Sequence, residues 1–120
     1  MRVAAYRRSS SEHDLQKQVL AYISLKGNHV FAFAIPNAAK RTPATAARMR
    51  AEGLMPGVAD LCVMLLGGKV GWLELKAARG RQSPEQEMFE EVCEVLGHCY
   101  AVARTLDEAI AILKSWGALK

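Results

Sequence analysis

The sequence has no apolar run that approaches the roughly 20 residues needed to span a bilayer. Its N-terminal segment lacks the long apolar core of a secretory signal. The three cysteines, Cys62, Cys93 and Cys99, include no C-x-x-C pair, which argues against a disulfide framework and against a zinc site. The three histidines never fall at metal-ligand spacing. We therefore expect a cytoplasmic protein that binds no membrane.

Internal repeats and low-complexity segments are also missing, and the chain of 120 residues has the size of one domain. We expect a single domain over residues 1–120, with residues 1–10 as a flexible basic N-terminus. The net charge of +4 is mild, but acidic residues concentrate in 85–94 and basic ones in 40–50 and 76–81. This asymmetry favours one face for a polyanion, although charge runs are usually solvated helix faces.

The alternation of apolar segments and turn residues predicts eight elements in the order α-β-(short α)-β-β-α-β-α. Gly67-Gly68 predicts a tight hairpin, and Ser83-Pro84-Glu85-Gln86 a capping box whose helix buries Phe89, Val92, Cys93 and Leu96. The expected strands cover residues 29–35, 58–66, 70–77 and 99–103. This order predicts an α/β fold with a mixed sheet of about four strands flanked by helices.

Charged residues within the expected strands are the candidates for catalysis or metal binding. Burying a charge in a strand is unfavourable, so such a residue suggests a functional role. Alternation along the strand places Glu74 and Lys76 on one face, and the glycine turn places Asp60 roughly opposite Glu74. Two adjacent carboxylates repel unless a proton or a cation lies between them. Mg²⁺ or Mn²⁺ suits such hard oxygen ligands, and Lys76 can offset charge on a phosphate. The simpler alternative is an exposed surface ion pair of Glu74 and Lys76.

Three motifs resemble the VRR-NUC family of PD-(D/E)xK nucleases, in particular its short standalone members from phages and bacteria. These motifs are Gly57-Val58-Ala59-Asp60, Glu74-Leu75-Lys76 and Ser83-Pro84-Glu85-Gln86. The resemblance covers most of the chain and departs from the family pattern at Ala59, where proline is usual. It implies a restriction-endonuclease-like fold with Asp60, Glu74 and Lys76 as catalytic residues. It also implies a divalent metal held by Glu12, Asp60, Glu74 and the Leu75 carbonyl.

Three of the candidate residues have a second interpretation. Glu12 lies at helical spacing from the apolar residues of the first helix, yet it also fits a capping box with Ser9. Gln86 is the natural last residue of its own capping box, but it also points toward the sheet, which makes it a candidate for contact with the active site and the nucleic acid. Asn37 is typical of a turn, whereas the resemblance implies a contact near the scissile phosphate.

Four basic residues lie in loops that frame the expected site. Lysine and arginine beside a metal site are what phosphate contacts require. Individually each fits a solvated side chain, but as a cluster they favour contact with DNA. They are Lys40, Arg41, Arg79 and Arg81.

The resemblance implies a metal-dependent, structure-selective endodeoxyribonuclease of a bacterium or a phage-infected cell. Standalone members of the family are homodimers that resolve four-way Holliday junctions, so we expect branched DNA as partner and no small-molecule cofactor. The alternatives are a flap or splayed-arm nuclease and a non-catalytic DNA-binding module with a nuclease-like fold. Clustered carboxylates facing a polyanion argue against the binding module. A restriction-type enzyme would need a sequence-reading element, for which the chain has no room.

Overall fold

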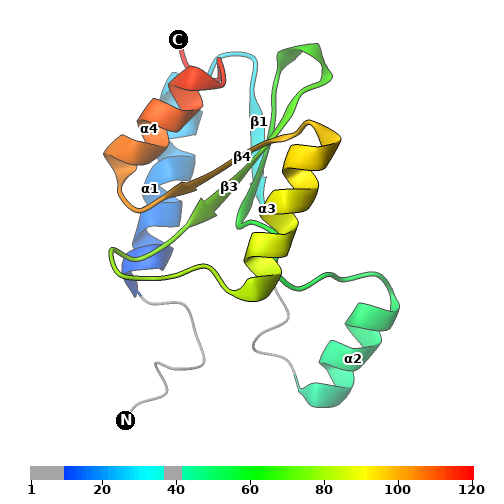
Figure 1. Cartoon of the computed structure of the whole chain (residues 1–120). Coiled ribbons are helices and arrows are strands. Elements are labelled where there is room, and N and C mark those ends of the chain that lie inside the picture. Colours follow the sequence, from blue (N-terminus) through cyan, green and yellow to red (C-terminus); the bar gives the residue numbers. More distant parts are fainter. Residues whose placement is uncertain (1–9, 37–41) are drawn as a thin grey trace.

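A mixed sheet of four strands forms the centre of the protein (Figure 1). The computed structural model describes residues 10–36 and 42–120. The elements follow the predicted order, which confirms the predicted fold class. They are α1 (Ser10–Lys26), β1 (Phe31–Ala34), α2 (Pro43–Ala51), β2 (Leu61–Met64), a 3₁₀ turn (Leu66–Gly68), β3 (Val70–Leu75), α3 (Pro84–Leu96), β4 (Cys99–Ala103) and α4 (Leu106–Ser115).

The strands lie side by side in the order β1-β2-β3-β4. β1 is antiparallel to β2 and β2 is antiparallel to β3, whereas β4 is parallel to β3, as expected for a strand that follows a crossover helix. The predicted hairpin turn has positive φ angles of 78° at Gly67 and 75° at Gly68, a conformation that glycine adopts without steric cost.

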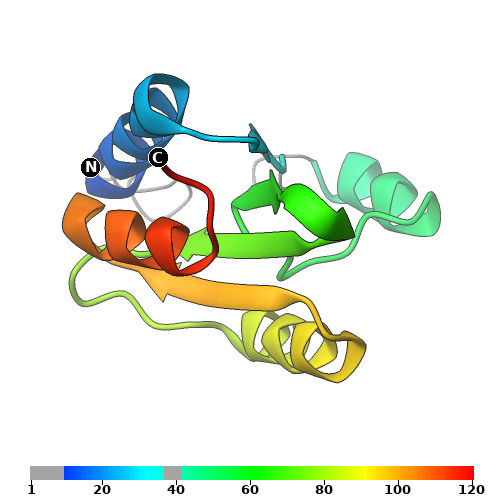
Figure 2. The same cartoon turned by 90° about the horizontal axis from the view of Figure 1, so that it is seen from above.

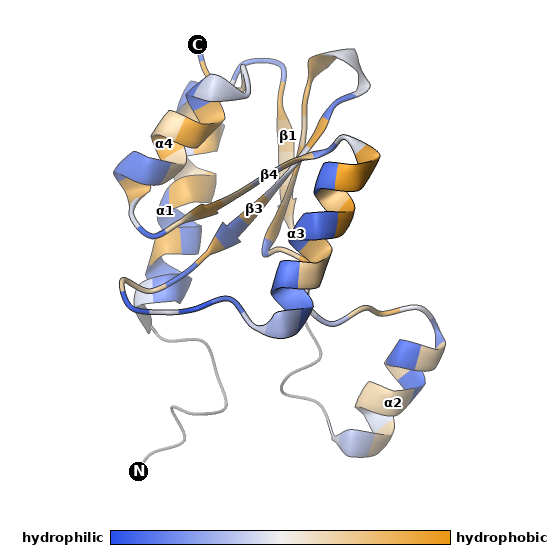
Figure 3. Cartoon of the chain, viewed as in Figure 1, coloured by the Kyte–Doolittle hydropathy of each residue, from blue (hydrophilic) through white to orange (hydrophobic). Residues whose placement is uncertain are grey.

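Helices cover the two faces of the sheet unequally (Figure 2). α1 and α4 pack on one face, where the core contains Val19, Leu61, Val63, Leu73 and Leu113, all fully buried. Figure 3 shows hydrophobic colour over much of the strands, and hydrophobic and hydrophilic residues mixed along each helix. α3 lies on the opposite face, together with the alternate side chains of β3. In the described part of the chain, no helix is long and apolar enough to cross a membrane.

Three strands are shorter than predicted, whereas β4 (Cys99–Ala103) has the predicted bounds. β1 begins at Phe31 rather than at His29, because His29 has a positive φ of 53° and Asn28 donates to the Ala118 carbonyl. β2 begins at Leu61 rather than at Val58, since the preceding loop turns at Gly57, where φ is 88°. This leaves Asp60 immediately before the strand. Of the predicted flexible segment 1–10, residues 1–9 lie outside the described residues, and Ser10 already belongs to α1.

The prediction that α3 buries four apolar residues is wrong for two of them. Cys93 is buried and Phe89 half-buried, but Val92 is 45% exposed and Leu96 68% exposed. α3 lies over β4 and the adjacent part of β3, where Phe89 contacts Trp72 and Tyr100. Val92 and Leu96 lie on the flank of α3, which no element covers in the described part of the chain.

Candidate active site

The β2–β3 hairpin places two carboxylates at the same end of the sheet. Leu61 pairs with Leu73 in the antiparallel register, so the preceding residue, Asp60, lies opposite Glu74. The Leu75 N–H donates to Asp60 Oδ2 over 2.8 Å, which fixes the Asp60 side chain at the end of β3. This arrangement agrees with the spacing counted from the glycine turn.

Glu74 is a buried carboxylate, only 3% exposed, on the α3 side of β3. Lys76 Nζ lies 3.6 Å from Glu74 Oε2, and Gln86 Nε2 donates to the same oxygen over 3.0 Å. A charge out of contact with water is tolerated only when such partners compensate it. The alternative of an exposed surface ion pair is therefore wrong, because the Lys76 side chain is itself only 12% exposed.

Gln86 fulfils both of its sequence interpretations. Its Oε1 accepts from the Ser83 N–H over 2.8 Å while its own N–H donates to Ser83 Oγ over 3.2 Å, which completes the capping box of α3. The other end of the same amide donates to Glu74. The first turn of α3 thus holds one side chain of the site in a fixed orientation.

Glu12 reaches the same end of the sheet from α1. Its Oε2 accepts from the Ala77 N–H over 3.0 Å, just beyond the end of β3. Ser9, the proposed partner in a capping box, lies outside the described residues. Along an extended strand, the N–H and C=O of one residue point to the same edge and alternate with those of the next. The Leu75 carbonyl therefore lies on the edge that faces Asp60 and Glu12.

The donor chemistry at this edge fits a hard divalent cation. Among residues 10–36 and 42–120, no three His, Cys, Asp or Glu side chains form a group that could hold a metal ion. Mg²⁺ does not need such a group, since it is usually bound by one or two carboxylates with waters and substrate phosphates. Asp60, Glu74 and the Leu75 carbonyl provide oxygen donors of this kind.

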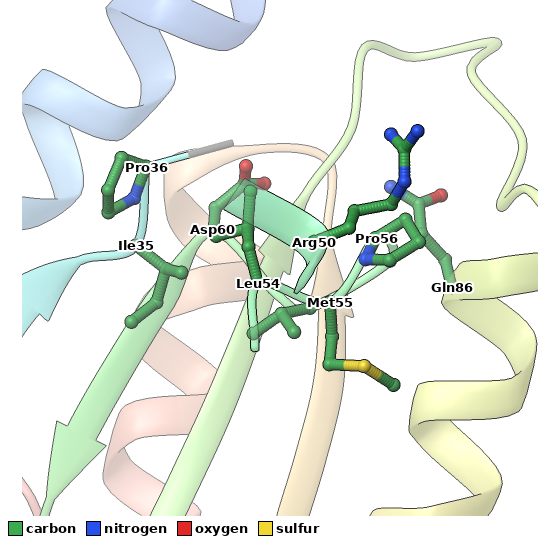
Figure 4. A pocket seen from close by; sticks show the side chains of 10 residues that line it. Ile35, Pro36, Arg50, Leu54, Met55, Pro56, Asp60 and Gln86 are labelled. Carbon is green, nitrogen blue, oxygen red and sulfur yellow. The ribbon is translucent and has the colours of Figure 1, made fainter. Parts of the chain in front are cut away.

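A pocket of about 350 Å³ opens beside Asp60. Figure 4 shows Asp60, Gln86 and Arg50 around it, with Ile35 and Leu54 among its apolar lining residues. Arg50 comes from α2 and received no individual role from the sequence. It could have been noticed because α2 ends just before the loop that leads back to Asp60. In that loop Gly57 packs against the Glu85 backbone of α3 so closely that no side chain would fit.

The predicted basic residues divide into two groups. Arg79 and Arg81 are exposed in the loop between β3 and α3, three and five residues after Lys76. Asn37, Lys40 and Arg41 lie outside the described residues. The sequence analysis missed Arg104, which follows β4 and donates to carbonyls of the same loop. No local motif marks it, because its partners are 24 and 27 residues away in the sequence.

The cysteines do not belong to the site. Cys62 and Cys93 are buried and Cys99 is half-buried. Burial, together with the neighbouring Glu90 and Glu94 carboxylates, raises the pKa of Cys93 to about 11. A thiol in such surroundings stays protonated and is a poor nucleophile.

The protein has a mixed α/β fold with paired carboxylates and a lysine at the end of its central hairpin. The chain is similar to two solved structures over nearly its whole length. One, described as a VRR_NUC domain protein, has a TM-score of 0.73 and 17% identity, with 92% of this chain and 90% of that chain covered. The other, described as a VRR_NUC domain, has a TM-score of 0.64 and 17% identity, with 88% and 97% covered. No protein-family model and no curated protein matches the sequence. The similarity to these two solved structures shows that the protein has the VRR-NUC fold.

Proposed function

We propose that this protein is a divalent-metal-dependent endodeoxyribonuclease that cuts branched DNA, with Asp60, Glu74 and Lys76 as its catalytic residues. The observation that carries the proposal is the pairing of Asp60 with Glu74 across the hairpin, with Lys76 Nζ 3.6 Å from the buried Glu74 carboxylate. A structural ion pair would not require a second carboxylate just before the neighbouring strand, beside a pocket.

Asp60, Glu74 and the Leu75 carbonyl would hold Mg²⁺ or Mn²⁺ together with water and phosphate oxygens. Glu12, the further ligand that the resemblance implies, lies at the same edge but does not form a three-carboxylate group with Asp60 and Glu74 among the described residues. The chemistry that such an ion supplies is polarisation of the phosphate and a lower pKa of a water molecule. Lys76 would stabilise negative charge on the reacting phosphate. Gln86, fixed by its capping box, would keep the Glu74 carboxylate oriented.

DNA would approach the end of the sheet where the pocket opens. The exposed Arg79 and Arg81 lie in the loop three and five residues after Lys76, and Arg50 lines the pocket beside Asp60. From the sequence we add Asn37, Lys40 and Arg41, which follow the Pro36 that lines the pocket. These residues would contact phosphates, which gives affinity and register without reading base sequence.

A four-way Holliday junction is the substrate we favour, because we also propose a symmetric homodimer with two sites. A flap or splayed-arm nuclease is the alternative with the same chemistry. The non-catalytic module is disfavoured, since keeping Glu74 buried beside a second carboxylate is unfavourable and adds nothing to the binding of a polyanion.

The test is cleavage of labelled junctions, flaps, splayed arms and linear duplexes with Mg²⁺ or Mn²⁺. Asp60→Asn and Glu74→Gln serve as near-isosteric variants, because they keep an acceptor for Leu75 and the shape of the buried side chain. We expect each to lose cleavage by at least about a hundredfold. The melting temperature of Asp60→Asn without metal should be unchanged or higher, since one of two like charges is removed. Glu74→Gln also leaves Lys76 without its carboxylate partner, so its melting temperature should not rise. Either variant retaining more than about 5% of the wild-type rate would contradict the assignment.

A further inference from the structure

The loop between β3 and α3 is held at several points, although it has no regular secondary structure. It connects Lys76 to Ser83, the N-cap of α3. At its start the Lys76 N–H donates to the Ala103 carbonyl of β4, and the Ala77 N–H donates to Glu12. The next residues turn back, with the Gly80 N–H donating to the Ala77 carbonyl over 2.9 Å.

Arg104 closes this turn from outside. Its Nη1 donates to the Ala77 carbonyl over 2.9 Å and to the Gly80 carbonyl over 2.6 Å. Its own N–H donates to Glu108 Oε1 over 2.7 Å, which ties it to the first turn of α4. Hydrogen bonds from a charged donor are stronger than neutral ones, and a guanidinium presents its N–H groups in a fixed fork.

The far end of the loop is held by Gln82. Its Nε2 donates to the Tyr100 hydroxyl over 3.0 Å and to Glu90 Oε1 over 3.1 Å. Burial, which outweighs the opposing effect of the Gln82 hydrogen bond, raises the pKa of Tyr100 above its usual range, so the hydroxyl stays neutral. With both ends fixed, the side chains of Arg79 and Arg81 remain on the outside and exposed.

We propose that Arg104 is a positioning residue, which fixes the turn from Ala77 to Gly80 so that Arg79 and Arg81 are presented together to the phosphates of a nucleic acid. The part that concerns DNA rests on the proposed function. The geometry favours this role over direct contact with DNA, because the Arg104 guanidinium is engaged with the loop carbonyls and is only partly exposed. A loop pre-ordered in this way loses less conformational entropy on binding.

Limited trypsin digestion of the full chain tests the structural part directly, since trypsin cuts after Arg79 and Arg81 only when that segment can open. Loss of two charge-assisted hydrogen bonds in Arg104→Gln should speed these cuts at least about tenfold. Arg104→Lys keeps one flexible charged donor, so its rate of cutting after Arg79 and Arg81 should lie between the rates of Arg104→Gln and the wild type. Cutting after Lys17, in the middle of α1, should not change and reports global unfolding.

Lys114→Gln is the matched control, because it removes one positive charge from the last turn of α4 without touching the loop. It should leave the cuts after Arg79 and Arg81 at the wild-type rate. If Arg104→Gln also leaves them at that rate, or accelerates the cut after Lys17 equally, Arg104 does not position the loop and the proposal fails.

DNA affinity measured against salt concentration tests the second part. Arg104→Gln should weaken binding several-fold, and Arg79→Ala should cost less in the Arg104→Gln background than in the wild type. If Arg79→Ala weakens DNA binding equally in the wild type and in Arg104→Gln, Arg104 does not present Arg79 and Arg81 to the phosphates. If the wild type binds no DNA, the proposed function fails, whereas the trypsin result still decides whether Arg104 holds the loop.

Discussion

At the scale of single residues, the surroundings of Lys76 separate two roles that a lysine can have near a phosphate. Its side chain is 12% exposed and its Nζ lies beside the buried Glu74 carboxylate, whereas Arg79 three residues later is exposed. A charge inside the site acts on the reacting group, and a charge on the surface acts on binding.

Lys76→Ala should therefore slow cleavage far more than it weakens DNA binding, by at least about a hundredfold in rate against a few-fold in affinity. Single-turnover cleavage and a binding titration in Ca²⁺ or without metal measure the two effects. Arg79→Ala is the comparison, and it should mainly weaken binding and reduce the salt slope by about one. Equal losses of rate and affinity in Lys76→Ala would make Lys76 a phosphate contact.

The residue positions that could be predicted are those set by local periodicity. Asp60, Glu74 and Lys76 follow from a glycine turn and the two-residue repeat of a strand, and the structure has that register. The partners of Glu12 and Arg104 could not be predicted, because the contacts join segments 65 and 27 residues apart in the sequence. Such contacts depend on how α1 and β4 pack, which local patterns do not encode.

At the scale of elements, the N-terminus of α3 couples helix capping to the active site. Ser83 and Gln86 stabilise the helix through the same capping box, but only Gln86 also contacts Glu74. The pair therefore separates a purely structural contribution from one that affects chemistry.

Ser83→Ala and Gln86→Ala should each destabilise the protein by about 1 kcal/mol, the usual contribution of an N-terminal cap. Only Gln86→Ala should also slow cleavage, because it leaves the Glu74 carboxylate without its amide donor. Thermal unfolding and cleavage rates measured on the same preparations check this. A rate loss in Ser83→Ala as large as that in Gln86→Ala would assign the whole effect to the helix.

Element types were easier to predict from the sequence than element faces and ends. Turn glycines, caps and apolar periodicity identify each helix and strand, including the short α2. They do not reveal that α3 covers only part of its face of the sheet, which is why Val92 and Leu96 were wrongly expected to be buried. Nor do they reveal where a strand loses its partner, as at His29 and Gly57.

At the scale of the whole molecule, α3 covers only part of the sheet face on which it lies. α3 covers β4 and the adjacent part of β3, whereas within residues 10–36 and 42–120 no helix covers the β1–β2 half, where Phe31 is 66%, Met64 49% and Phe33 39% exposed. Phe31 and Met64 are register partners, so these side chains form one apolar surface. Isolated exposed apolar residues are normal, but a contiguous surface of this kind usually marks an interface.

We expect a second copy of the chain to cover this apolar surface, in line with the homodimer proposed above. A two-fold axis along the strands would seat α3 of one copy on the open β1–β2 half of the other, and the exposed Val92 and Leu96 would meet Phe31 and Met64. Two copies would also supply the two cuts that resolution of a four-way junction needs, since one site cuts one strand.

Wild-type protein at micromolar concentration should therefore have the mass of a dimer in light scattering. Phe31→Glu should shift it to the monomer, because a charge buried in an apolar interface is strongly unfavourable. Leu25→Glu, at a residue that is 78% exposed on α1 over the opposite face, is the matched control and should remain a dimer. In junction cleavage, Phe31→Glu should lose paired cuts and keep single-strand nicking, since its active site is unchanged. A monomeric wild type that cuts junctions and linear duplexes equally would contradict the dimer. A dimer that prefers flaps would retain the nuclease and exclude the junction as its substrate.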